Sequence, residues 1–117
     1  MKTKGLSEAN YVNSVDAIGA ILLLLSDGAP GESYNVVNET THRTIREVAQ
    51  LVIDEFSGGM SSIQIDIDEQ NLSGYAADVK LKLCAHKLNA LGWIPQYSLL
   101  DSFAQLKNYI DEASMPL

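Results

Sequence analysis

A helix is predicted between Ser14, a suitable N-cap residue, and a stop at Asp27-Gly28. Its apolar residues recur every three or four positions at Val15, Ile18, Leu22 and Leu25. Three more apolar residues widen this surface, namely Ile21, Leu23 and Leu24. Because so wide a surface cannot be buried from one side only, we expect neighbouring elements to cover this helix on more than one side.

Two further helices are predicted from capping signals. Thr44 and Glu47 have the spacing of a capping box, and the helix that they begin should end at residues 57–59. Its inner face is predicted to be Ile45, Val48, Ala49, Val52 and Phe56. Ser98 and Asp101 form a similar start for a final helix. The inner face of that helix is predicted to be Leu99, Phe103, Leu106 and Ile110.

Extended segments are predicted where β-branched and aromatic residues lie between turn formers. Residues 33–37 are predicted to form a short buried strand, and residues 63–68 alternate strictly between apolar and polar side chains, which is typical of a strand with one buried face. Residues 10–13 and 80–83 are expected to be shorter extended segments. Residues 1–9 show no periodicity, and a loose start is expected there.

One short helix completes the prediction. Residues 85–91 are long enough for about two helical turns, and Gly92 suits a left-handed cap after them. Trp93-Ile94-Pro95 should leave this helix in an extended conformation, because a residue before proline avoids the helical region. The predicted fold class is therefore α+β, derived from an α/β fold, with about four helices packed on two to four short strands.

The composition fits one folded domain. The chain has 117 residues, of which 46% are hydrophobic and 20% charged, and its net charge of −7 opposes binding to nucleic acid. The longest apolar run, residues 20–25, is far shorter than the roughly 20 residues of a membrane span, so no membrane association is expected. The single cysteine, Cys84, cannot form an internal disulfide, which favours the cytoplasm.

A self-contained catalytic, metal or cofactor site is not predicted. Gly58-Gly59 follows a helix instead of joining a strand to a helix, so no phosphate-binding loop is present. His42 and His86 lack a second ligand at metal spacing, and Cys84 beside His86 is expected to be packed rather than reactive. The acidic residues around Asp66 are better explained as a solvated strand face than as a calcium loop.

Three stretches, in this order, resemble the C-terminal portion of the NAD-dependent epimerase/dehydratase family, the extended short-chain dehydrogenase/reductases that act on nucleotide sugars. The first is residues 11–18, YVNSVDAI. The second combines residues 31–36, GESYNV, with residues 44–49, TIREVA. The third and most specific is KLNALGWIP at residues 87–95, followed by Ser98-Leu99.

The resemblance implies a partial enzyme. Family members place the glycine-rich NAD loop and the catalytic tyrosine-lysine pair in an N-terminal doubly wound domain, which this sequence does not contain. Residues 1–117 should then be the small substrate-binding lobe, inactive alone, of an enzyme in which NAD takes a hydride from a dTDP- or UDP-hexose and later returns it. The parent enzyme could be a dehydratase (a lyase) or an epimerase (an isomerase), with a role in polysaccharide biosynthesis.

The resemblance also suggests where a nucleotide sugar would bind. Ala9 stands where the family usually has an arginine that holds phosphate, and Cys84 stands where it commonly has an aspartate. Lys80 and Lys82 are candidate substitute cations, and Tyr75 could stack on the base, although a solvated edge strand explains the two lysines equally well.

The alternative hypothesis is a free-standing, non-catalytic module that binds proteins or forms a homo-oligomer through the apolar first helix.

Overall fold

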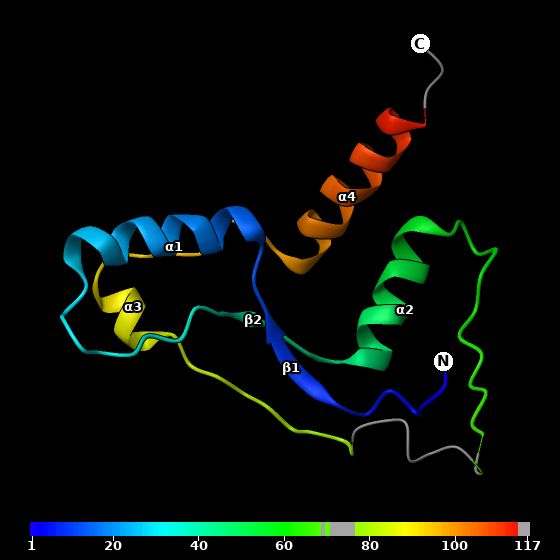
Figure 1. Cartoon of the computed structure of the whole chain (residues 1–117). Helices are drawn as coiled ribbons and strands as arrows, with labels where there is room; N and C mark the ends of the chain where they lie inside the picture. Colours follow the sequence, from blue (N-terminus) through cyan, green and yellow to red (C-terminus); the bar gives the residue numbers. More distant parts are fainter. Residues whose placement is uncertain (69, 71–76, 115–117) are drawn as a thin grey trace.

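A computed structural model of the chain describes residues 1–68, 70 and 77–114. The elements in chain order are β1 (Glu8–Tyr11), α1 (Ser14–Asp27), β2 (Asn38–Thr44), α2 (Ile45–Phe56), α3 (His86–Ala90) and α4 (Leu99–Ala113). Figure 1 shows α1 and α3 at one end of the two strands and α2 at the other. These four helices and the two-stranded antiparallel sheet confirm the α+β class.

Helices α2 and α4 begin where their capping signals predict. The hydroxyl of Thr44 accepts a hydrogen bond from the backbone N–H of Glu47, whose carboxylate accepts one from the backbone N–H of Thr44, at 3.1 and 2.7 Å. Ser98 and Asp101 make the same reciprocal pair, at 3.0 and 2.9 Å. Each pair satisfies two backbone donors that a helix start leaves unpaired. The short helix α3 also lies within its predicted range.

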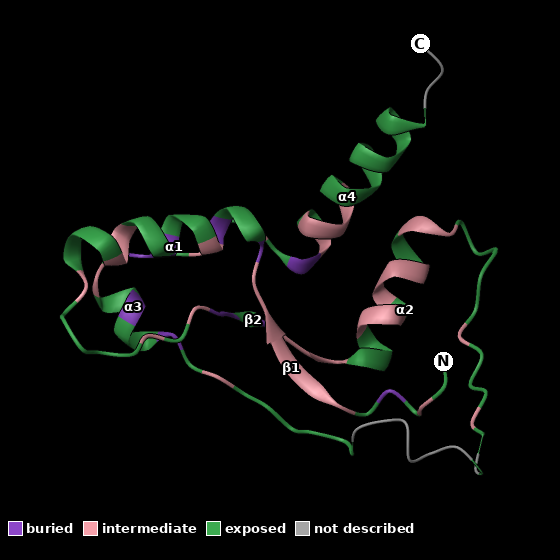
Figure 2. Cartoon of the chain, in the orientation of Figure 1, coloured by how far each residue is buried: buried purple, intermediate pink, exposed green. Residues whose placement is uncertain are grey.

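Helix α1 differs from its prediction in two respects. Its N-cap is Asn13, whose side chain accepts from the N–H of Val15, so the cap lies one residue before Ser14. The apolar residues that recur at helical spacing, namely Val15, Ile18, Leu22 and Leu25, are exposed, while Asp16 and Ala20 on another face are buried. Within the described chain the helix is therefore covered on one side, not on several, as Figure 2 shows.

The two strands pair in antiparallel register, with Glu8 opposite Thr44 and Tyr11 opposite Asn38. Between these pairs β2 has extra residues, and the buried hydroxyl of Thr41 accepts the N–H of Tyr11 at 2.7 Å in place of a backbone carbonyl. This bulge shortens the regular ladder of backbone hydrogen bonds, but the backbone N–H of Tyr11 still has an acceptor.

Two predicted strands are wrong. Residues 33–37 are irregular, and side chains hold them in place: Tyr34 accepts the N–H of Ala29, and Asn35 donates to the carbonyl of Cys84. Residues 63–68 are also no strand: the N–H of Asp66 donates to the carbonyl of Met1, and these residues join no sheet in the described part of the chain. Alternation alone cannot provide the paired edge that a strand needs.

The start of the chain is more ordered than its lack of periodicity predicts. The carbonyls of Gly5 and Ser7 accept the N–H groups of Arg46 and Ile45 at 2.9 and 3.0 Å, and β1 begins at Glu8. Gly5 and Ser7 are thus bonded to the first turn of α2.

The core is small and the chain is open in shape. The largest buried cluster lies between α1, α3 and the segment before β2, and consists of Ala20, Val37, Ala85, Leu88 and Trp93. The radius of gyration is 17.6 Å, whereas a compact domain of this length should have about 13 Å. Helices α2 and α4 extend away from that cluster (Figure 1), which accounts for the open shape.

Candidate functional site

Residues 79–83 run parallel to β1 and place both predicted lysines beside it. The N–H of Glu8 donates to the carbonyl of Val79 at 2.7 Å, and the N–H of Leu81 donates to the carbonyl of Glu8 at 2.9 Å. Lys80 therefore pairs with Glu8. Because side chains two residues apart in an extended segment share a face, Lys80 and Lys82 lie on one face of this segment. Both are exposed; Lys80 forms an isolated β-bridge, and residues 81–83 belong to no strand.

Glu39, at the start of β2, lies in a cluster with Cys84 and His86 and is close enough to Lys82 for its charge to act on the carboxylate. The pKa of Glu39 is lowered from its ordinary value, first by a hydrogen bond from the Cys84 thiol and then by the backbone N–H of Ala85. The charges of His86 and Lys82 lower it further, while burial acts in the opposite direction. The Cys84 Sγ also lies 3.3 Å from His86 Nδ1. The carboxylate of Glu39 thus stays ionised among these groups.

A hollow of about 470 Å³, here called the β2–α3 hollow, adjoins this cluster. Its walls combine apolar and polar side chains: Val37, Asn38, Glu39, Thr40, Asn89, Ile94 and Pro95. The volume lies in the range typical of small-molecule sites. Apolar surface beside a carboxylate, an amide and a hydroxyl can receive a polyol, because a sugar ring offers both apolar faces and hydroxyl groups.

Two buried nitrogen atoms nearby have no hydrogen-bond partner among the described residues, Asn10 Nδ2 and His42 Nε2. The other end of the Asn10 amide accepts the N–H of Leu83 at 2.6 Å, so this side chain lies against the lysine segment. His42 Nε2 lies 3.7 Å from a carboxylate oxygen of Glu8, beyond hydrogen-bond distance. Unpaired buried nitrogens of this kind could accommodate a polar ligand.

The structure brings together only part of the predicted site. Lys80 and Lys82 lie beside β1, whereas Tyr75 falls outside the described residues. Sequence reasoning missed Glu39 and Asn89, because neither belongs to a motif and only the folded chain places them at one hollow. Cys84 was expected to be packed, but it is exposed. Glu39 and His86 lie beside it.

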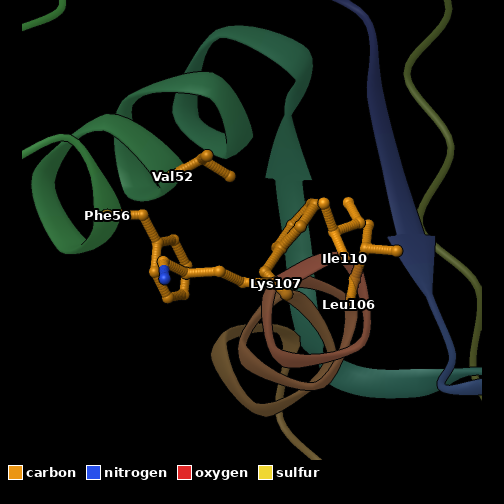
Figure 3. A pocket seen from close by; sticks show the side chains of 6 residues that line it. Val52, Phe56, Leu106, Lys107 and Ile110 are labelled. Atoms are coloured by element: carbon orange, nitrogen blue, oxygen red, sulfur yellow. The ribbon is translucent and has the colours of Figure 1, made fainter. Parts of the chain in front are cut away.

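A second depression, lined by apolar side chains, lies between α2 and α4. Its volume is about 240 Å³, and Figure 3 shows Val52 and Phe56 of α2 facing Leu106, Lys107 and Ile110 of α4 across it. The only charged group on its wall is the side chain of Lys107. This groove lacks the hydrogen-bonding groups that a nucleotide sugar would need, so the β2–α3 hollow is the better candidate.

The described residues do not fit a dinucleotide cofactor. Bound pyrophosphate usually sits at a helix N-terminus after a glycine-rich loop. Here Asn13, Thr44 and Ser98 already cap α1, α2 and α4, and an acidic side chain lies in the first turn of each of these helices. Those carboxylates would repel a pyrophosphate.

Metal sites and membrane-spanning helices are both absent from the described part of the chain. No group of three or more histidine, cysteine, aspartate or glutamate side chains is placed to hold a metal ion there. Among the same residues, no helix has the length and apolar character needed to cross a membrane.

Sequence comparison finds enzymes that modify nucleotide sugars. The chain is 27% identical over 115 residues to UDP-D-apiose/UDP-D-xylose synthase 1 of Arabidopsis thaliana, a match that covers 90% of this chain and 30% of that protein. It is 25% identical over 95 residues to dTDP-D-glucose 4,6-dehydratase of Mus musculus, covering 79% of this chain and 26% of the relative. No family model matches the chain.

Solved structures with the same fold include dTDP-glucose 4,6-dehydratases, as the sequence comparison does. The dTDP-glucose 4,6-dehydratase of Bacillus anthracis, solved with NAD, superposes with a TM-score of 0.76 at 22% identity, over 94% of this chain and 33% of that one. The dTDP-glucose 4,6-dehydratase DesIV of Streptomyces venezuelae, solved with NAD and TYD, gives a TM-score of 0.73 at 25% identity, with the same coverage. The chain thus spans about a third of the proteins that it matches. Sequence and fold together relate it to the NAD-dependent epimerase/dehydratase family.

Proposed function

We propose that this chain is the C-terminal nucleotide-sugar-binding region of an enzyme similar to dTDP-glucose 4,6-dehydratases or UDP-sugar 4-epimerases. The partial matches to such enzymes support this proposal most directly. The parent enzyme would be a lyase or an isomerase that uses NAD, and its compartment would be the cytoplasm. The chain by itself would bind substrate without converting it.

The proposed binding mode divides the ligand between two neighbouring surfaces. The sugar would occupy the β2–α3 hollow, where Glu39 and Asn89 offer hydrogen-bonding groups and Ile94 and Pro95 offer apolar surface. The diphosphate would lie against Lys80 and Lys82. The effect of the Lys82 charge on the pKa of Glu39 supports this division, because it requires the lysine to lie near the hollow.

Electrostatics make the two lysines essential to this mode. Because the chain has a net charge of −7, its overall field repels a dianionic diphosphate, and binding needs local cations. Lys80 and Lys82 supply two positive charges on one face.

Calorimetry with dTDP-glucose and UDP-glucose tests the proposal. We expect weak binding of at least one of them, with affinity reduced roughly threefold to tenfold for each of Lys80→Met and Lys82→Met. Lys107→Met is the matched control, because it removes an exposed lysine from α4, which does not line the β2–α3 hollow. Absence of binding to both ligands would contradict the proposal, and so would equal losses in all three variants.

A second assay addresses the inactivity of the isolated chain. We expect no product when the chain is incubated with NAD and either nucleotide sugar, because its described residues do not fit a dinucleotide. Formation of a keto-sugar or an epimer would show that this part of the proposal is wrong.

The alternative function, a non-catalytic module, is favoured by the exposed apolar face of α1. Such a module could have kept the fold of its relatives while losing catalysis. In that case neither nucleotide sugar should bind, and self-association should be the measurable property of the chain.

A further inference from the structure

The β2–α3 hollow has a single ionisable group among the described residues of its wall, the carboxylate of Glu39. The other polar groups on that wall are the neutral side chains of Asn38, Thr40 and Asn89. Its described residues include no lysine, arginine or histidine. A ligand in the hollow therefore meets one negative charge and no cation on the wall itself.

Two hydrogen bonds hold the Glu39 carboxylate in its ionised form. The Cys84 thiol donates to this carboxylate, and the backbone N–H of Ala85 donates to its Oε1 atom at 3.3 Å. These two bonds, that of the thiol first, lower the pKa of Glu39 below its ordinary value of 4.5. At neutral pH the carboxylate is thus charged and offers only acceptor atoms to a ligand.

The hydroxyl group of Thr40 adds a further acceptor to the wall. Thr40 Oγ1 donates its proton to Asn38 Oδ1 at 2.7 Å, and the same oxygen accepts the backbone N–H of Thr40 at 3.1 Å. The amide nitrogen of Asn38 in turn donates to the carbonyl of Tyr97 at 3.1 Å. Because its proton is engaged in this way, the Thr40 hydroxyl has only lone pairs left for a ligand in the hollow.

A wall of this kind distinguishes a neutral sugar from an acidic one. The hydroxyl groups of a neutral hexose can donate to the carboxylate of Glu39 and to the oxygen of Thr40. A uronic acid carries a carboxylate in place of the hydroxymethyl group, and an ionised carboxylate has no proton to donate. In the hollow it would face the acceptor atoms of the wall and the like charge of Glu39, and both contacts are unfavourable.

Two positive groups near Glu39 do not cancel its charge. Protonated His86 and Lys82 act on the carboxylate, each more weakly than its two hydrogen bonds. In the proposed binding mode Lys82 also faces the diphosphate, whose negative charges balance those of Lys80 and Lys82. The carboxylate of Glu39 is then a net negative charge beside the sugar.

We propose that Glu39 determines the sugar specificity of the β2–α3 hollow, selecting a neutral, hydroxyl-bearing hexose and discriminating against a uronic acid. This inference rests on the proposed function, because it concerns the sugar of the same nucleotide-sugar ligand. Glu39 is exposed, so the preference should be moderate and should weaken as salt screens the two like charges.

Calorimetry with UDP-glucose and UDP-glucuronate tests this specificity, because the two ligands differ only in the hydroxymethyl group of one and the carboxylate of the other. In the wild-type chain we expect UDP-glucose to bind roughly threefold to tenfold more tightly at low salt, and the ratio should shrink at high salt. Glu39→Gln removes the charge at nearly the same shape and should make the two affinities about equal. Glu112→Gln is the matched control, since it removes the same charge from an exposed position on α4, which does not line the hollow, and it should leave the ratio unchanged.

Circular dichroism of each variant verifies the fold, and the salt dependence of the wild-type chain needs no variant. If only dTDP-glucose binds, the dTDP forms of the same two sugars are compared. Equal affinities for the glucose and glucuronate forms in the wild-type chain would overturn the role of Glu39 but leave the nucleotide-sugar site in place, and so would a ratio that Glu39→Gln does not change. If no nucleotide sugar binds, the proposed function fails and this inference fails with it.

Discussion

The indole Nε1–H of Trp93 donates to the backbone carbonyl of Asp16 at 3.0 Å, which links the first turn of α1 to the segment that follows α3. The carboxylate of the same aspartate accepts the N–H groups of Gln96 and Tyr97, the shortest contacts to each being 3.0 Å. Asp16 and Trp93 are both buried. These bonds make Asp16 a structural residue that holds Trp93, Gln96 and Tyr97 against α1.

Replacing Asp16 should therefore destabilise the chain. Asp16→Ala leaves two backbone N–H groups without their acceptor, and we expect the free energy of unfolding to fall by about 2–4 kcal/mol. Urea titration followed by the fluorescence of Trp93, the single tryptophan, measures this change. Asp111→Ala is the control, because Asp111 is exposed and its carboxylate pairs with Lys107 on the same helix, an interaction worth about 0–0.5 kcal/mol. Equal effects in the two variants would contradict the structural role.

Local signals in the sequence predicted the helices well, whereas contacts between distant residues were not predictable. The capping boxes at Thr44 and Ser98 involve residues three apart, so the sequence contains all that they need. Residues 63–68 have a strand pattern, but whether they form a strand depends on an edge that only the folded chain could provide.

The same distinction explains the errors on α1 and at the candidate site. Apolar residues occur on several faces of α1, so periodicity could not show that Ala20 rather than Leu22 faces the core. The tertiary hydrogen bonds of Asp16 join it to residues 77 to 81 positions away. Glu39 and Asn89 meet at one hollow only because β2 and α3 are neighbours in space, and no spacing rule could reveal that.

Leu88 should contribute more to stability than any partly exposed leucine. It is fully buried in the cluster between α1 and α3. Leu88→Ala removes this packing and leaves a cavity, which should cost about 2–5 kcal/mol. Leu106→Ala, on the half-exposed side of α4, should cost less than about 1.5 kcal/mol because solvent already reaches the side chain. Thermal unfolding of the two variants under one condition compares them, and a smaller effect for Leu88→Ala would contradict the position of the core.

The cluster at the hollow makes a prediction about pH. Since the Cys84 thiol is the largest cause of the lowered pKa of Glu39, Cys84→Ala should raise that pKa toward its ordinary value of 4.5. In the wild-type chain the lowered pKa of Glu39 stabilises the folded state above pH 4.5. This contribution to the free energy of unfolding disappears as the pH falls through the pKa that Glu39 has in the folded state. The Cys84→Ala variant should therefore lose less stability than the wild-type chain when the pH falls from 5 to 3.

Carboxyl chemical shifts measured by NMR during an acid titration provide the test of the Glu39 prediction. Glu47 is an internal control, because its pKa is lowered by the backbone N–H of Thr44 and should not respond to the cysteine. If the pKa of Glu39 is the same in both chains, the thiol does not hold this carboxylate.

Two glycines should respond in opposite directions to the same substitution. Gly92 has a φ of 102°, a conformation that L-residues rarely adopt, so Gly92→Ala should destabilise the chain by about 1 kcal/mol or more even though a Cβ would meet nothing within 4 Å.

Gly19 lies inside α1 with equally open surroundings, and Gly19→Ala should stabilise the monomer by about 0.5–1 kcal/mol through helix propensity. Urea titrations at low protein concentration, where self-association is negligible, compare the variants. A destabilising Gly19→Ala would mean that its surroundings are not open, and a neutral Gly92→Ala would mean that the turn after α3 does not need a left-handed residue.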